Sequence, residues 1–114
     1  MFVLNKYNEH ELEIGGIRFV CETVVDGLEE TAAQIARIYE SKLDDIANYM
    51  LRNGLSDVFG ELLPEQLIVS LGKATIDLNR CLILYLEHTL DDTHIIEVEY
   101  GGALDEFFYF NLDG

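Results

Sequence analysis

The stretch that decides the fold is residues 26–54, DGLEETAAQIARIYESKLDDIANYMLRNG. Its apolar side chains recur at steps of four and three residues, which places them on one face of an α-helix. The members of this stripe are Leu28, Ala32, Ile35, Tyr39, Leu43, Ile46 and Met50. Asp26 and Glu29 have the spacing of a capping box, and the pattern runs on to Arg52. The sequence therefore predicts one amphipathic helix about 40 Å long, with room for a bend near Ser41.

A β-hairpin is predicted before this helix. The runs Glu11–Ile14 and Ile17–Thr23 alternate apolar and polar residues on either side of Gly15 and Gly16. Two glycines tolerate the positive φ angles of a tight turn. The pattern leaves open whether the hairpin joins the main sheet.

Short helices and then strands are predicted after the long helix. Residues 55–72 read as short helical pieces, with Pro64 at a first helical position. Four β-rich runs follow with short connections between them: Ala74–Leu78, Cys81–His88, Thr93–Tyr100 and Leu104–Leu112. Short connections favour an antiparallel meander. We expect a single α+β domain, residues 1–114, ordered ββ-α-(short helices)-ββββ, with the antiparallel meander packed on the one long helix.

The alternation along the last strands predicts a second sheet face that mixes acidic and aromatic side chains. The candidate partner-binding residues on it are Tyr85, Glu87, Glu97, Glu99, Phe107 and Tyr109. Aromatic anchors would provide affinity, and the glutamates would raise the rate of association with a cationic surface. The alternative is that this face is covered, either by the N-terminal hairpin or by a second copy of the chain.

The net charge narrows the class of partner. Twenty-two Asp and Glu residues against seven Lys and Arg residues give −15, and no Lys or Arg follows Arg80. Such a chain cannot neutralise phosphates, so we expect no nucleic-acid partner, and an anionic membrane surface would repel it. Its field favours a cationic protein partner. The alternative is that the charge serves solubility alone.

The sequence contains no motif that supports catalysis, a cofactor or a metal. The patterns GxSxG, GxGxxG, GxxxxGK[ST] and HExxH are all missing. Glu97 and Glu99 lie one strand step apart, but no feature of the sequence marks the pair for acid–base chemistry. His88 and His94 flank two aspartates at a spacing that matches no metal-ligand pattern, and we interpret them as solvated turn residues. We therefore expect a non-enzymatic chain with no cofactor and no metal.

The expected compartment is the cytoplasm. The longest apolar run, Cys81–Leu86, falls far short of the about 20 residues that span a bilayer, so no membrane association is expected. The first residues lack the apolar core of a signal peptide. Two cysteines are too few for a disulfide-stapled secreted scaffold.

The second half of the chain carries a family resemblance. Its features are the segment PEQLIVSLGKATIDL, the hairpin LEHTLDDTHIIEVEY and the closing strand DEFFYFNLDG, which together cover residues 64–114. In layout and charge they resemble small acidic bacterial proteins of unknown function that are encoded beside polymorphic toxins and act as immunity partners. The resemblance implies inhibition by occlusion of a cationic toxin or nuclease domain, and it assigns no role to individual residues. The alternative is a structural or homodimerising cytoplasmic protein.

Overall fold

A computed structural model describes residues 1–114 and shows an α+β fold built on one seven-stranded sheet. The strands follow one another in the sheet in chain order, and all neighbours are antiparallel except β3 and β4, which are parallel. The elements are β1 (Val3–Leu4), β2 (His10–Ile14), β3 (Ile17–Cys21), α1 (Leu28–Met50), α2 (Ser56–Phe59), α3 (Pro64–Leu71), β4 (Thr75–Asp77), β5 (Leu82–Tyr85), β6 (Ile95–Gly101) and β7 (Glu106–Asp113).

The predicted N-terminal hairpin is confirmed, and it belongs to the main sheet. Ile14 pairs with Ile17 around Gly15 and Gly16, which have φ angles of 58° and 82°. The link to the meander is the parallel pair β3–β4, in which Phe19 lies opposite Ile76. Parallel neighbours need a long crossover, and here the segment that contains α1 to α3 supplies it.

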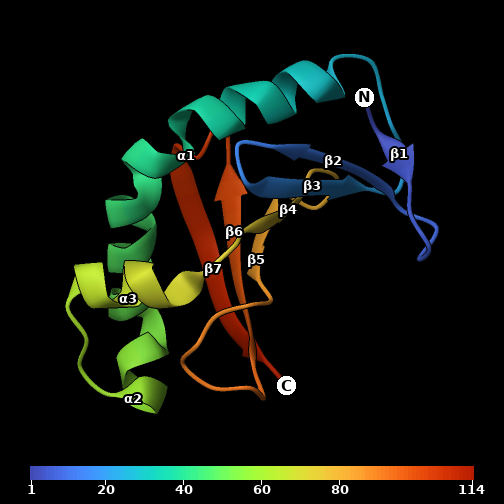
Figure 1. Ribbon diagram of the computed structural model, residues 1–114. Helices are drawn as coiled ribbons and strands as arrows, with labels where there is room; N and C mark the ends of the chain where they lie inside the picture. The colour runs from blue at the N-terminus through green and yellow to red at the C-terminus, as the bar shows by residue number, and fades with distance from the viewer.

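The long helix covers one face of the sheet with the predicted stripe. Its buried residues are Leu28, Ala32, Ile35, Tyr39, Ile46, Ala47 and Met50. Figure 1 shows α1 turning near its middle, so that its first half runs above β2 and β3 and its second half runs beside the β6–β7 hairpin. In that region the hydroxyl of Ser41 donates to the carbonyl of Ile38 at 2.6 Å, a local bond that often bends helices. The bend predicted near Ser41 is present.

The expected capping box at the start of the helix is wrong. The helix begins at Leu28 after Gly27, whose φ is 83°, and no side chain caps its first turn. Glu29 instead forms an ion pair with the terminal ammonium group of Met1. After α1 the chain makes a wider turn through Leu51–Leu55, then α2, then α3 with Pro64 at its first position as predicted.

Strand β5 faces the opposite way from the prediction, so Tyr85 is in the core and not on the second face. Its side chain has no exposed surface, and it packs on the helix side with Ile83. Every residue of the run Cys81–Leu86 is aliphatic, aromatic or cysteine, so hydrophobicity alone does not select a face. The turn between β4 and β5 decides which face Tyr85 takes. It pairs Leu82 with Asp77, and both of these residues point away from the helices.

A register shift in the β6–β7 pair moves Phe107 as well. Tyr109 pairs with Glu99, but Phe107 pairs with the next residue, Tyr100, so one residue of β7 is extra at this point. An extra residue breaks the alternation of sides, so the residues before it and after it no longer follow one pattern. Phe107 therefore lies against the helix layer, with its ring centroid 5.7 Å from that of Tyr49.

Candidate binding surface on the open sheet face

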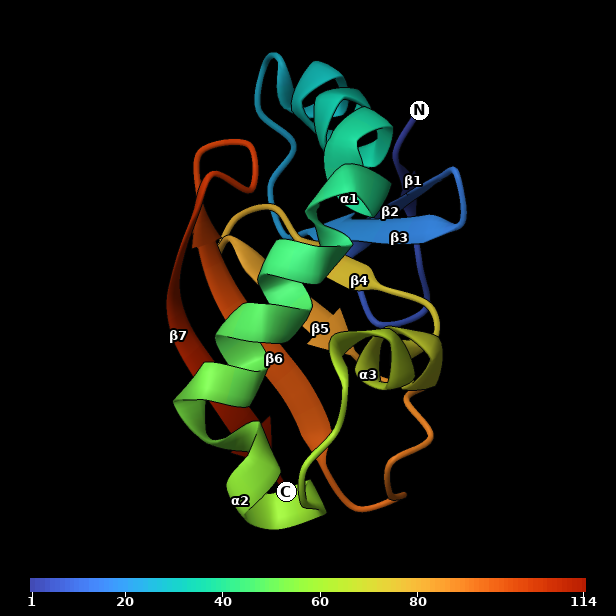
Figure 2. The same cartoon turned by 90° about the vertical axis from the view of Figure 1, so that its left-hand side faces the viewer.

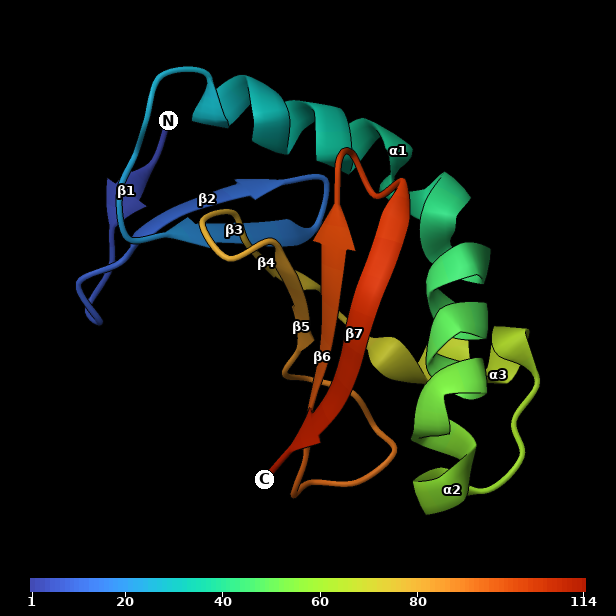
Figure 3. The same ribbon diagram turned by 180° about the vertical axis from the view of Figure 1, so that it is seen from behind.

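The sheet face that carries no helix, here called the open face, presents two rows of side chains across the strands. Figures 1 and 3 show that the sheet bends between β3 and β5 and that α1 lies outside the bend, which leaves the open face on the inside. The strand register gives one row as Glu11, Val20, Asp77, Leu82, Glu99 and Tyr109, and the next as Glu13, Arg18, Thr75, Leu84, Glu97 and Asn111. The open face is therefore a concave surface.

A groove of about 220 Å³ lies in this concave surface. Its lining residues are Asn5, Tyr7, Glu9, Glu11, Arg18, Val20, Thr75, Leu84 and Leu86. Val20 and Thr75 are buried, and they line this groove together with residues of the loop before β2. The groove thus combines apolar side chains with polar and charged ones, as protein-binding patches do.

The loop before β2 holds an aromatic side chain at the rim of the groove. The side-chain oxygen of Asn5 accepts from the backbone N–H groups of Tyr7 at 2.9 Å and Glu9 at 3.0 Å. The backbone of Asn5 donates to the carbonyl of Glu9 at 2.7 Å, which closes the loop. Tyr7 projects from it with 72% of its surface exposed. A ring presented by a fixed loop loses little conformational entropy when a partner covers it.

The open face is strongly negative. Its carboxylates are Glu9, Glu11, Glu13, Asp77, Glu97, Glu99 and Asp113. Glu97 and Glu99 form no ion pair, and no side-chain hydrogen bond involves them. Arg18 is the only Lys or Arg within the strands of the sheet. Its Nε and Nη2 both donate to the hydroxyl of Thr75, at 3.1 and 3.0 Å. The two free glutamates are therefore available to a cationic group.

The structure brings together half of the predicted site residues. Glu97, Glu99 and Tyr109 share the open face, and Tyr109 is 52% exposed. Glu87 is exposed but lies beyond the end of β5, and Tyr85 and Phe107 face the helices.

The residues that sequence reasoning missed come from the N-terminal third of the chain. They are Tyr7, Glu9, Glu11 and Arg18. Their alternation along the hairpin was readable, but their place beside the meander depends on the parallel β3–β4 pair. Nothing local in the sequence marks that pair.

Tyr85 instead anchors the core through a hydroxyl pair. Its Oη lies 2.5 Å from the Oη of Tyr39 on α1, and Tyr85 has no exposed surface. Burial raises the pKa of Tyr39 to about 12 and raises the pKa of Tyr85 further above its ordinary value. Both hydroxyls therefore stay neutral over the physiological range, as a structural bond requires.

The two histidines of the β5–β6 connection are structural too, and the interpretation of His88 as a solvated residue is wrong. His88 is buried, its Nε2 donates to the carbonyl of His94 at 2.6 Å, and its Nδ1 accepts from the N–H of Leu90 at 3.2 Å. His94 in turn bonds Asp91 at 2.5 Å, and this hydrogen bond lowers the pKa of Asp91 to about 2. Phe59 packs edge-on against both imidazole rings.

No group of three or more His, Cys, Asp or Glu side chains is arranged to hold a metal ion. None of the helices combines the length and the apolar character needed to cross a membrane. No protein-family model, no curated protein and no solved structure matches the chain.

Proposed function

We propose that this chain is a non-enzymatic binding protein that uses its open face to hold a cationic protein partner. The observation that carries the proposal is the concave surface itself, on which Glu97 and Glu99 are unpaired, Tyr7 and Tyr109 are exposed, and a partly apolar groove is present. Buried aromatic and aliphatic area supplies affinity, and complementary charge supplies specificity and a fast encounter. A net charge of −15 extends that attraction beyond the contact.

The resemblance of residues 64–114 to immunity proteins suggests what kind of partner this would be. An immunity partner acts by covering a cationic toxin domain, and no catalytic group is needed for that. The concave face, the unpaired glutamates and the excess of acids after Arg80 all support such a role. The cytoplasm is the compartment in which it would operate.

The competing role is a homodimer that buries the same face. Two copies would each bring a charge of −15, and their open faces would set carboxylates against carboxylates. Like charges across an interface oppose association. Light scattering at micromolar concentration separates the two roles, since a monomer excludes the dimer.

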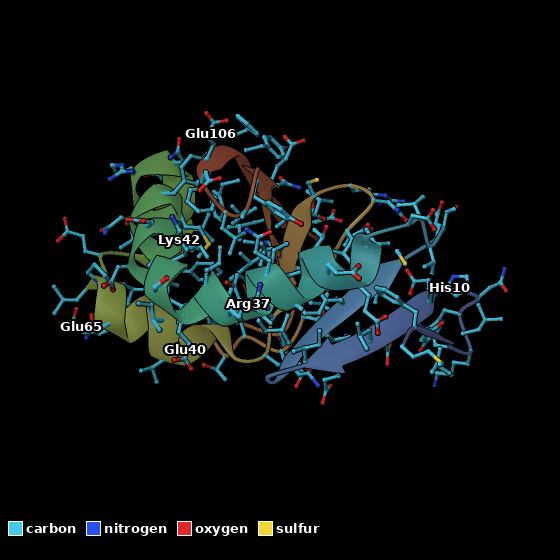
Figure 4. The ribbon with its side chains drawn as sticks, turned by 90° about the horizontal axis from the view of Figure 1, so that it is seen from above. His10, Arg37, Glu40, Lys42, Glu65 and Glu106 are labelled. Atoms are coloured by element: carbon cyan, nitrogen blue, oxygen red, sulfur yellow. The ribbon has the colours of Figure 1, made fainter.

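The proposal is tested with two double variants of equal charge. Glu97→Lys/Glu99→Lys alters the open face, and Glu40→Lys/Glu61→Lys alters exposed acids of the helical layer, where Figure 4 shows Glu40 projecting from α1. A partner is captured from cells that express the chain naturally, and its affinity for each version is measured by calorimetry. We expect a basic partner whose affinity falls about tenfold or more with the first variant and within about twofold with the second.

Three outcomes would argue against the proposal. The first is a captured protein that is not basic, and the second is an equal loss of affinity with the two double variants. The third is that the chain, used as bait, retains no protein even at low ionic strength. Circular dichroism of both variants checks that each one remains folded.

A further inference from the structure

Strand β7 forms a free edge of the sheet. It is the last strand and pairs with β6 alone, and no backbone hydrogen bond outside the regular elements reaches residues 106–113. Figure 2 shows β7 at the margin of the sheet with no element beyond it. Alternate residues along the strand therefore direct their N–H and C=O groups to solvent, where another strand could bond them.

This edge has few of the usual protections: the extra residue between Phe107 and Tyr109 and the acid at each end are those present. The opposite edge, β1, is only two residues long, whereas β7 has eight residues and contains neither Pro nor Lys. Its six central residues, Phe107–Leu112, are uncharged, and Phe108 and Tyr109 are 58% and 52% exposed. The regular, uncharged stretch Tyr109–Leu112 lies beyond the extra residue, and uncharged edge stretches with high β propensity are sites where a further strand adds.

The charges at the ends of β7 select the occupant. Glu106, at the rim of the molecule in Figure 4, and Asp113 close the two ends of the strand. An in-register antiparallel pair of two β7 strands would place Glu106 of each copy opposite Asp113 of the other. Like charges directly opposite in a sheet are destabilising, so a second copy is disfavoured. A strand with cations at its two ends meets opposite charges instead.

We propose that β7 binds an extended cationic segment of a partner as an eighth strand of the sheet. Main-chain bonds would hold the segment, and its terminal Lys or Arg side chains would reach Glu106 and Asp113. The inference rests on the proposed function for the existence of a cationic partner, whereas the free edge and the acids at its two ends are separate observations.

The probe is a seven-residue capped peptide, Lys-Val-Thr-Val-Thr-Val-Lys, whose two Lys side chains lie on one face of a strand, as Glu106 and Asp113 do in β7. One control peptide has Glu at both ends, and another has Pro in place of two of the central residues. Amide shifts and amide hydrogen exchange of the full chain are followed by NMR. We expect the Lys-ended peptide to protect alternate amides of residues 106–113 and to bind at least about fivefold more tightly than the Glu-ended one.

A charge swap gives a second test. In the double variant Glu106→Lys/Asp113→Lys the preference between the Lys-ended and Glu-ended peptides should reverse. The inference is overturned if no peptide protects β7, if the Pro-interrupted peptide protects β7 equally, or if the swap leaves the preference unchanged. These results would not refute the proposed function of the open face, because that proposal is tested with Glu97 and Glu99 and not with the edge strand.

Discussion

The hydroxyl pair of Tyr39 and Tyr85 offers a sharp test of the strand register. If β5 turns Tyr85 toward α1, the neighbouring Leu84 and its partner Glu97 must face the open side. Each hydroxyl can be removed by substitution with Phe, which keeps the ring. The free energy of unfolding then reports what the removed hydroxyl contributed and what was left unpaired.

The structure predicts that the two single substitutions lower the free energy of unfolding by unequal amounts. Tyr39→Phe leaves the hydroxyl of Tyr85 fully buried without a partner, at a cost of about 2 kcal/mol. Tyr39 is slightly exposed, at 9%, and lines the groove between the β2–β3 turn and α1, so we expect Tyr85→Phe to leave a less completely buried hydroxyl and to cost about 1 kcal/mol. The double variant leaves no hydroxyl unpaired and should lose about 1–2 kcal/mol, less than the sum of the single losses.

The assay is urea unfolding of the wild type and the three variants, followed by circular dichroism. For a domain of this size each kcal/mol corresponds to about 4 °C in Tm, so thermal melts give an independent reading. Additive losses, or a loss under about 0.5 kcal/mol for Tyr39→Phe, would mean that the two hydroxyls do not meet in the core. The register that places Glu97 on the open face would then be refuted.

Two further predictions concern the segments around β5. Ionised Asp91 has a pKa of about 2 against 3.8 unfolded, so its stabilising effect is full above pH 4 and is lost as the pH falls toward 2. The difference in unfolding free energy between wild type and Asp91→Asn should therefore shrink over that range in urea titrations, and a constant difference would contradict the Asp91–His94 bond. Gly72 has a φ of 70°, and a Cβ there would lie 2.9 Å from the carbonyl oxygen of Glu87, whereas the same Cβ at Gly60, with φ 81°, meets no atom within 4 Å. Gly72→Ala should thus lower the unfolding free energy by about 1 kcal/mol more than Gly60→Ala, and equal losses would contradict this packing.

Much of the fold could be predicted because its signals are local. A few neighbouring residues are enough to predict three of its features, namely the apolar stripe of α1, the Gly15–Gly16 turn and the start of α3 at Pro64. The start of α1 differs from the prediction, because the capping-box spacing at Asp26 competes with the freedom of Gly27 to adopt a positive φ.

The candidate site was harder to predict because it depends on register and on pairing across the chain. The face of β5 is set by the pairing of Asp77 with Leu82, and the face of Phe107 is set by a single extra residue in β7. A one-residue slip reverses every side chain beyond it, and an apolar or aromatic run carries no alternation that would reveal the slip. The position of Arg18 beside Thr75 on the open face depends on the parallel pairing of two strands that are more than fifty residues apart in the chain.

The most direct test of the central claim is the ionic-strength dependence of the association rate between this chain and its captured partner. Stopped-flow measurements would compare wild type with Glu97→Lys/Glu99→Lys and with the charge-matched Glu40→Lys/Glu61→Lys. The account predicts a rate that falls steeply with salt for wild type and for the helical-layer variant, and a clearly shallower fall for the open-face variant. Equal salt dependences for the two variants would show that the partner does not approach through the open face.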